Sequence, residues 1–409
     1  MKKNFLEDLP WLDEMSKKMN GRSTPSFREV NGHIHTPYSF SAFDKLDTAF
    51  SMARDENISV LGINDFFVTD GYDEFAAGCR KNRIFPLFNI EFIGLLKEEQ
   101  KKGIRINDPN NPGRIYFSGK GLDYPFDPGF FNKQKLKKLI ASSQDQIKAM
   151  IGKLNGLIGK TNPSLSLSYE EVKRRFARDL VRERHLAKAI RHLANESFDT
   201  EEKQMIFIEG LYGQKSKTGM SNPSALENEI RSNLLKAGGA AFVEEDEESF
   251  LELDKIIKII NEAGGIPCYP VLLDDANGKF TEFESDSEKL LGSLRKLGIA
   301  CIELIPGRND SGILKKFVEF FHQNDFVILL GTEHNTPEMI PLKVTARGNT
   351  ELDASLKAIA WEGACVVAAH QYLRAKGRQG FVLQNGRLSH DEKDDLTKLG
   401  RMVIEYSLI

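Results

Sequence analysis

Short apolar runs alternate with amphipathic helical patterns along this 409-residue chain, and this alternation limits the possible folds more than any other feature. In the first stretch, strands are predicted at Val30–His35, Ile58–Ile63 and Ile84–Ile93. Helices are predicted between them, at Asp44–Asn57 and Tyr72–Asn82. Helical crossovers of this length join parallel strands, so the pattern predicts a parallel sheet or barrel.

The same alternation resumes near residue 250, with strands predicted at Ile266–Leu272, Ala300–Leu304 and Phe326–Leu330. The region between the two stretches is rich in Lys and Arg and is predicted to form long helices at Lys133–Leu157 and Tyr169–Asn195. The sequence therefore predicts one α/β barrel split by a helical insertion. Its divisions are an N-terminal arm (1–27), the first part of the barrel (28–123), the insertion (124–250), the second part of the barrel (251–345) and a C-terminal helical extension (346–409) that contains a helix at Asp353–Ala375.

Composition excludes several classes of protein. Lys and Arg number 56 against 59 Asp and Glu, so no basic surplus favours binding to duplex nucleic acid. No apolar run is long enough to cross a bilayer, and the first residues lack the apolar core of a signal peptide, so we expect a cytoplasmic protein without a membrane partner. The cysteines are scattered, which favours buried thiols over disulfides: Cys79, Cys268, Cys301 and Cys365.

Two histidines at the end of the first predicted strand, His33 and His35, are the sharpest local feature. Side chains at positions i and i+2 of a strand point to the same side. At the C-terminal end of a barrel strand, both imidazoles would face the mouth and could bind one metal ion. Polar residues of the kind that bind metals also end later apolar runs, namely Asp65, Glu91, Glu333 and His334. Helix capping is the alternative role for each acid.

These residues belong to motifs whose order resembles that of the PHP (polymerase and histidinol phosphatase) superfamily, from Val30 to about Pro337. The motifs are His33-x-His35-Thr-x-x-Ser39, Gly62-Ile-Asn-Asp65, Glu91, Gly264-Gly265-Ile-Pro-Cys-Tyr269-Pro270 and Gly331-Thr-Glu333-His334-Asn335. In the insertion, Val181–Ile190 resembles the Arg-x-His-(Ile/Phe)-Ala-x-x-Leu helix of the nucleotide-phosphatase and exoribonuclease branch.

This resemblance implies a distorted (β/α)7, TIM-like barrel that holds up to three divalent metals at its C-terminal rim and acts on phosphate esters. It implies that Arg184 and His185 contact a substrate phosphate, a role that suits the planar donors of arginine. The alternative for Arg184 is a solvated position on a basic helix.

Several family metal ligands are replaced in this chain. Phe66 and Tyr269 stand where the family has His, Phe40 where it has Asp, and Asn335 where it has the last His. A further family His, on the fourth strand, has no match. The resemblance therefore implies a partly degraded site with one intact position for Zn, Mn or Fe, held by His33, His35, Glu91 and Glu333.

The leading hypothesis is a metal-dependent phosphoesterase acting on a small phosphorylated metabolite or nucleotide. One ion could activate water, and the candidate acid/base residues are Asp65, His334 and Tyr269. Two alternatives stay open: an isomerase, lyase or non-phosphate hydrolase that uses one metal on a sugar or sugar acid, and a binding protein that has lost catalysis. The segment Gly119-Lys120-Gly121 is expected to be a flexible turn. Whether the chain forms a homo-oligomer stays open.

Overall fold

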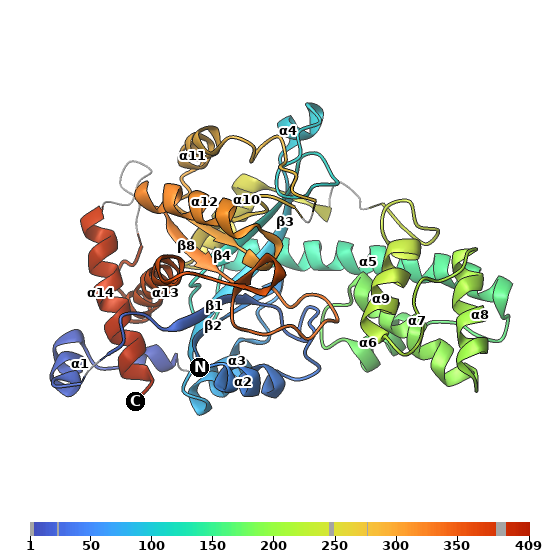
Figure 1. The fold of residues 1–409 in the computed structure, drawn as a ribbon, viewed down its shortest axis with the longest axis horizontal. Coiled ribbons are helices and arrows are strands. Elements are labelled where there is room, and N and C mark those ends of the chain that lie inside the picture. The colour runs from blue at the N-terminus through green and yellow to red at the C-terminus, as the bar shows by residue number, and fades with distance from the viewer. Residues whose placement is uncertain (1–3, 23, 245–248, 276, 382–389) are drawn as a thin grey trace.

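A sheet of eight strands forms the centre of the computed structural model, which describes residues 4–22, 24–244, 249–275, 277–381 and 390–409 (Figure 1). Seven strands follow one another around the sheet in the order β1 (Glu29–Ile34), β2 (Ile58–Phe66), β3 (Phe85–Leu95), β4 (Arg114–Lys120), β6 (Ile266–Val271), β7 (Cys301–Leu304) and β8 (Val327–Leu330). The eighth, β5 (Leu251–Glu252), pairs with β3 outside this order.

The two ends of the sheet meet, so the seven strands nearly close into a barrel. Ile34 and Glu333 form a parallel bridge just beyond β8. The His35 N–H donates to the Glu333 carbonyl at 2.7 Å, and the Glu333 N–H donates to the His33 carbonyl at 2.9 Å. The predicted barrel-like α/β architecture is therefore confirmed. A regular (β/α)7 count is not, because β4 runs antiparallel to both neighbours, β3 and β6.

Amphipathic helices cover the sheet where the apolar spacing predicts them. They are α2 (Leu46–Asp55), α3 (Tyr72–Lys81), α10 (Leu253–Glu262), α11 (Ser287–Lys296) and α12 (Ser311–Gln323). In α10, the buried residues are Leu253, Ile256, Ile259 and Ile260, a helical spacing that places them on one face. Two shorter helices, α1 (Leu12–Met19) and α4 (Lys97–Lys101), lie outside the alternating pattern.

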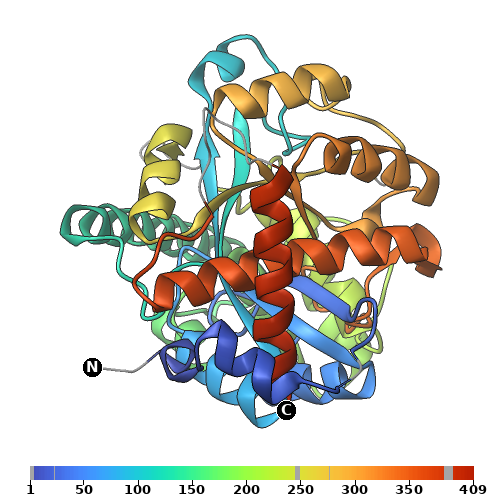
Figure 2. The same ribbon diagram turned by 90° about the vertical axis from the view of Figure 1, so that its left-hand side faces the viewer.

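Two C-terminal helices, α13 (Ala354–Ala375) and α14 (His390–Ser407), lie at the end of the molecule opposite the insertion (Figure 1). They cross each other on that face, as Figure 2 shows. The Gln371 side chain fixes α13 to β3, because its amide accepts from the Phe88 N–H at 2.8 Å and donates to the Pro86 carbonyl at 3.1 Å. The predicted helix at Asp353–Ala375 is confirmed, with Asp353 as its cap.

The inserted helices form a separate layer beyond the other end of the barrel (Figure 1). They are α5 (Phe130–Thr161), α6 (Tyr169–Phe176), α7 (Glu183–Ser197), α8 (Glu201–Tyr212), α9 (Pro223–Ile230) and the π-helical turn η2 (Arg231–Leu235). Their buried apolar side chains, between Ile147 and Ala241, form a hydrophobic cluster of their own.

The prediction of one helix over Tyr169–Asn195 is wrong, because the chain is extended between α6 and α7. The side chain of Gln144 holds this segment: its amide donates to the Val181 carbonyl at 3.1 Å and accepts from the Val181 N–H at 3.0 Å. Leu180 and Val181 are both fully buried there. A tertiary contact thus overrides local helix propensity.

The described residues contain no helix that is both long and apolar enough to cross a membrane. All four cysteines are buried and free, which confirms the expectation of buried thiols. Residues 1–3 and 23 of the predicted arm lie outside the described residues, as do 245–248, 276 and 382–389 of the later divisions. The described part of the arm contacts α14 through a hydrogen bond from the Lys18 ammonium to the Tyr406 hydroxyl at 3.3 Å, and Arg28, directly after the arm, forms an ion pair with Glu405 of α14 at 2.6 Å.

Closure of the barrel depends on the absence of a side chain at Gly331. A Cβ atom at this position would lie 2.5 Å from the Cβ of His33 and 2.8 Å from its backbone nitrogen. We predict that Gly331→Ala lowers the free energy of unfolding by about 1–3 kcal/mol, because β1 and the end of β8 must move apart.

Chemical denaturation of the purified variants would measure this effect. Gly292→Ala, in the middle of α11 with nothing within 4 Å of a new Cβ, is the matched control and should gain up to about 1 kcal/mol. Equal stability changes in the two variants would contradict the packing argument.

Candidate metal centre

His33, His35 and Glu91 converge inside the mouth of the barrel. Their ligand atoms all lie within 4.8 Å of one another, and all three residues are buried. The two Nε2 atoms are 3.3 Å apart, and Glu91 Oε2 lies 3.2 Å from His35 Nε2 and 3.8 Å from His33 Nε2. The strand-end prediction thus identified residues that the fold does bring together.

The chemistry of this group fits a divalent metal ion. Glu91 Oε2 is buried without a hydrogen-bond partner, and burial raises the pKa of Glu91 to about 8. Burial also lowers the pKa of His35 to about 4, so its imidazole is neutral at pH 7 and free to act as a ligand. Two His and one Glu are a ligand set of catalytic zinc sites, which leave further coordination positions open. A metal ion bound here would give Glu91 Oε2 the partner that it lacks.

Behind His33 lies a buried charged network that sequence analysis missed. His33 Nδ1 is 2.9 Å from Glu303 Oε2, and the Lys120 ammonium donates to the same oxygen at 2.6 Å. Ser118 donates to Glu303 Oε1 at 2.6 Å, and Lys120 also donates to Asn64 at 3.0 Å. Although burial alone would raise the pKa of Glu303, Lys120 and His33 hold it below its usual range.

A carboxylate that accepts from one ring nitrogen fixes the tautomer and leaves the other nitrogen to the metal. The expectation of a flexible turn at Gly119-Lys120-Gly121 is wrong, because Gly119 and Lys120 are the last residues of β4 and Lys120 is fully buried. The signals available in the sequence were weak: one acid inside the short apolar run of β7, and one lysine between the two glycines of Gly119-Lys120-Gly121.

Asp65 lies beside His35 and is held by protein donors. Its carboxylate accepts from the Thr36 N–H at 2.7 Å, from the Thr36 hydroxyl at 2.5 Å and from the Ser39 hydroxyl at 2.6 Å. His35 Nδ1 is 3.9 Å from Asp65 Oδ1. These contacts suit an orienting role for Asp65, whose pKa burial raises.

Glu333, the fourth predicted ligand, lies near this group but is not part of it. Its backbone has a positive φ of 71°, as does that of His334 at 54°, which is uncommon for residues other than glycine. The bridge to β1 holds this turn in place. The carboxylate of Glu333 forms an ion pair with Arg308 and is not among the ligand atoms clustered around Glu91.

Two of the candidate acid/base residues make contacts away from the cluster. His334 Nδ1 lies 2.7 Å from the Thr332 hydroxyl, its Nε2 lies 2.9 Å from the Ile340 carbonyl, and its ring stacks on Phe43. Tyr269 donates its hydroxyl proton to Glu284 at 2.7 Å. Like Asp65, neither is among the residues that line the cavity described next.

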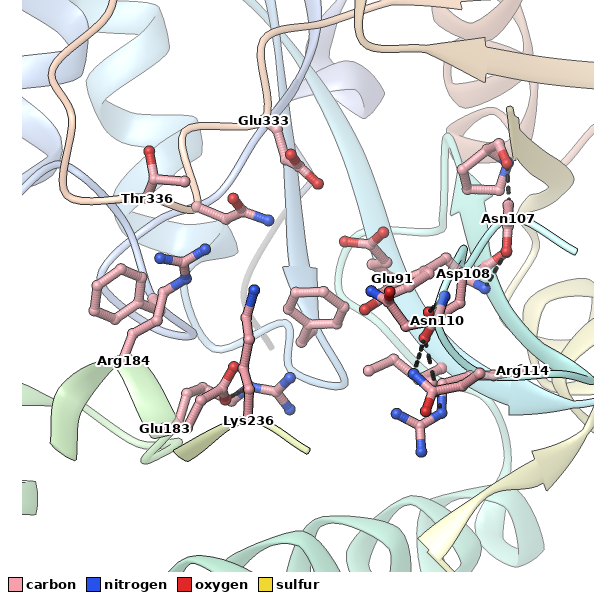
Figure 3. Close-up of a pocket in the computed structure, with 18 of the residues that line it drawn as sticks. Glu91, Asn107, Asp108, Asn110, Arg114, Glu183, Arg184, Lys236, Glu333 and Thr336 are labelled. Carbon is pink, nitrogen blue, oxygen red and sulfur yellow. Dashed lines mark hydrogen bonds and ion pairs between the residues drawn. The ribbon is translucent and has the colours of Figure 1, made fainter. Parts of the chain in front are cut away.

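A cavity of about 730 Å³ opens between the barrel mouth and the insertion. His33, Glu91, Glu303 and Glu333 line its barrel side. The insertion contributes one carboxylate, Glu183, and four cations: Arg182, Arg184, Arg231 and Lys236. Figure 3 shows Arg184, Glu183 and Lys236 on one side of this space, with Glu91, Asp108 and Arg114 on the other and Glu333 beside the gap.

Of the two predicted phosphate contacts, only Arg184 lines the cavity. Its guanidinium donates to Asn228 at 3.1 Å, and desolvation together with Arg231 lowers its pKa to about 10. His185 lies in the first turn of α7, where its Nδ1 accepts from the Arg182 N–H at 2.9 Å, and burial lowers its pKa to about 3. The arginine of an Arg-x-His pattern would fall at 183, where the chain has Glu, so Arg182 and Arg184 flank that position.

The aromatic replacements pack against these groups. Phe66 stacks on His35 with ring centroids 4.9 Å apart. The Arg182 guanidinium lies over the same Phe66 ring, 4.7 Å from its centroid. Phe40 contacts His185 edge-on at 4.9 Å. The phenyl ring of Phe66 therefore stands directly beside the group of His33, His35 and Glu91.

Comparisons with known proteins support the fold. No family model matches the chain, and a search of curated proteins found no match. A solved structure from Bifidobacterium adolescentis, described as a "putative metal-dependent phosphoesterase", aligns with a TM-score of 0.52 and 13% identity over 82% of this chain and 96% of its own. An amidohydrolase from Chromobacterium violaceum aligns with a TM-score of 0.47 and 14% identity over 80% of this chain and 95% of its own. The chain therefore shares the fold of the first protein.

The buried pair of Lys120 and Glu303 generates a stability prediction. Removing one partner leaves the other charge buried without compensation, so Lys120→Met should lower the free energy of unfolding by about 3–5 kcal/mol. Adding Glu303→Gln to that variant should recover part of the loss, because both charges are then gone. Denaturant titration of the single and double variants measures the coupling.

Lys343→Met is the control, since Lys343 pairs with Glu351 in an exposed position and should cost at most about 1 kcal/mol. A loss for Lys120→Met no larger than that of this control would show that the buried pair does not stabilise the barrel.

Proposed function

We propose that this protein is a metal-dependent phosphoesterase of the PHP type, acting on a small phosphorylated metabolite or nucleotide with one divalent ion. The observation that carries the proposal is the buried group of His33, His35 and Glu91, with an unpartnered carboxylate oxygen, at the floor of a cavity whose opposite wall is cationic. The ordered sequence motifs and the fold shared with a described phosphoesterase agree with it.

The two walls of the cavity suit the two parts of phosphoester hydrolysis. A bound Zn²⁺, Mn²⁺ or Fe²⁺ would supply Lewis acidity and lower the pKa of a coordinated water. Glu303 keeps His33 oriented for ligation through its 2.9 Å contact. The cations of the insertion, Arg184 and Arg231 among them, would bind the phosphate and offset the negative charge of the reacting group.

Several contacts favour a site with one metal ion over a site with two or three metal ions. Phe66 occupies the space against His35, and Tyr269 and Asn335, which stand where the family has His, are poor metal ligands. Tyr269 is already bonded to Glu284. With one metal ion, arginine side chains would have to offset the rest of the negative charge on the reacting phosphate. An enzyme that uses one metal ion on a sugar acid stays the second candidate.

Metal content per chain, measured by elemental analysis on protein purified without chelator or nickel resin, tests the proposal. We predict about one Zn, Mn or Fe per chain, and loss of that metal in His33→Ala because only two ligands of the group then remain. His322→Ala is the matched control, since His322 pairs with Glu362 on the surface of the molecule and should keep the metal.

The metal-loaded protein would then be assayed on phosphate esters of nucleotides and sugars beside sugar acids. Hydrolysis of a phosphate ester that is lost in His33→Ala and kept in His322→Ala supports the phosphoesterase. Turnover of sugar acids alone would favour the second candidate. A chain that takes up no metal even after reconstitution would be a binding protein.

A further inference from the structure

Glu333 is held between two competing partners. Its backbone hydrogen bonds with His33 and His35 place it next to the metal-ligand group, but its carboxylate pairs with the guanidinium of Arg308. A carboxylate engaged by arginine has less capacity to bind a metal ion, because both cations compete for the same lone pairs. The described structure therefore shows the fourth predicted ligand occupied by a cation of the chain itself.

Arg308 is placed to meet a ligand. It ends the short turn η4 (Pro306–Arg308) that follows β7, and its carbonyl accepts from Arg347 Nε at 2.8 Å, which braces the backbone. Its side chain lines the cavity and is 43% exposed, whereas that of Glu333 is only 14% exposed. An anion that enters the cavity thus reaches the guanidinium before it reaches the carboxylate.

We propose that Arg308 is an anion-binding residue of this site and that it releases Glu333 when it binds the anionic group of the substrate, so that Glu333 completes the metal site. This inference rests on the proposed function and adds a specific residue and an order of contacts to it. Guanidinium binds phosphate as well as carboxylate in the same planar, bidentate geometry, so the exchange keeps the charge of Arg308 compensated.

The exchange couples the two ligands of the site. An anion that removes Arg308 leaves Glu333 without its cation, and a metal ion then gains that carboxylate as a ligand. By linkage, a bound metal ion strengthens anion binding by the same factor. The electrostatic consequence is that the metal should bind more tightly when an anion is present, although the anion need not touch the other three ligands.

Titration calorimetry of Mn²⁺ into the metal-free full chain, with and without a fixed concentration of inorganic phosphate, tests this coupling. In the wild type, phosphate should tighten Mn²⁺ binding by about fivefold or more. In Arg308→Met, Mn²⁺ should bind more tightly than in the wild type without phosphate, because Glu333 is already free. Phosphate should then tighten Mn²⁺ binding less than it does in the wild type, because only the cations of the insertion remain to bind it.

Two further variants make the outcome specific. Arg374→Met removes an arginine of similar exposure, 37%, that pairs with Asp123, and it should behave as the wild type; it also corrects for complexes of Mn²⁺ with phosphate in solution. Glu333→Gln should bind Mn²⁺ more weakly and show no effect of phosphate. Thermal melting establishes that each variant is folded.

The results separate this inference from the proposed function. If the wild type binds Mn²⁺ with an affinity that phosphate does not change, or if Arg308→Met binds it no more tightly, the exchange is overturned while the metal centre stands. If the wild type binds no metal ion, both the exchange and the proposed phosphoesterase are overturned.

Discussion

The contact that closes the sheet, between β1 and the residues after β8, is the one on which the site depends. Through it, the backbone of Glu333 lies against His33 and His35, and the chain leaves β8 by a turn with two positive φ angles. Gly331 permits the approach because a side chain there would collide with His33. Closure and assembly of the site are therefore one event: the same backbone bonds that complete the barrel bring strand ends from both halves of the chain together.

Charge is arranged differently on the two sides of the cavity. Inside the barrel, the Lys120 ammonium is compensated by Glu303, whose second role is to orient His33. The insertion contributes four cations and one carboxylate to the cavity, and burial together with the nearby Arg231 lowers the pKa of Arg184. Because Glu183 pairs with Arg231, this wall is only partly compensated, and its remaining positive charge is costly in the free protein and favourable once an anion is bound. In the proposed function, the insertion would therefore recognise the anionic substrate, while the barrel would supply the metal ligands.

Sequence analysis predicted the strand-end ligands because a local rule suffices for them. His33 and His35 share one face at the end of β1, and Glu91 lies in β3, which runs parallel to β1 with β2 between them, so strand polarity alone brings the three residues to one rim. The residues it missed have partners far away in the sequence. Lys120 meets Glu303 across the barrel interior, and no local pattern marks a lysine for burial. The split between α6 and α7 has the same cause, since Gln144 acts on Val181 from another helix.

The sequence by itself determined the alternating α/β architecture, the position of the helical insertion and three potential metal ligands on one rim, because apolar periodicity and strand polarity are local properties of the chain. Only the tertiary structure decided that β4 runs antiparallel, that Glu333 pairs with Arg308 and that Phe66 stands against His35. These outcomes depend on which side chains meet across the barrel and on how buried charges find partners. These contacts between distant residues depend on packing and electrostatics over the whole fold. The sequence pattern of a single segment carries no information about them.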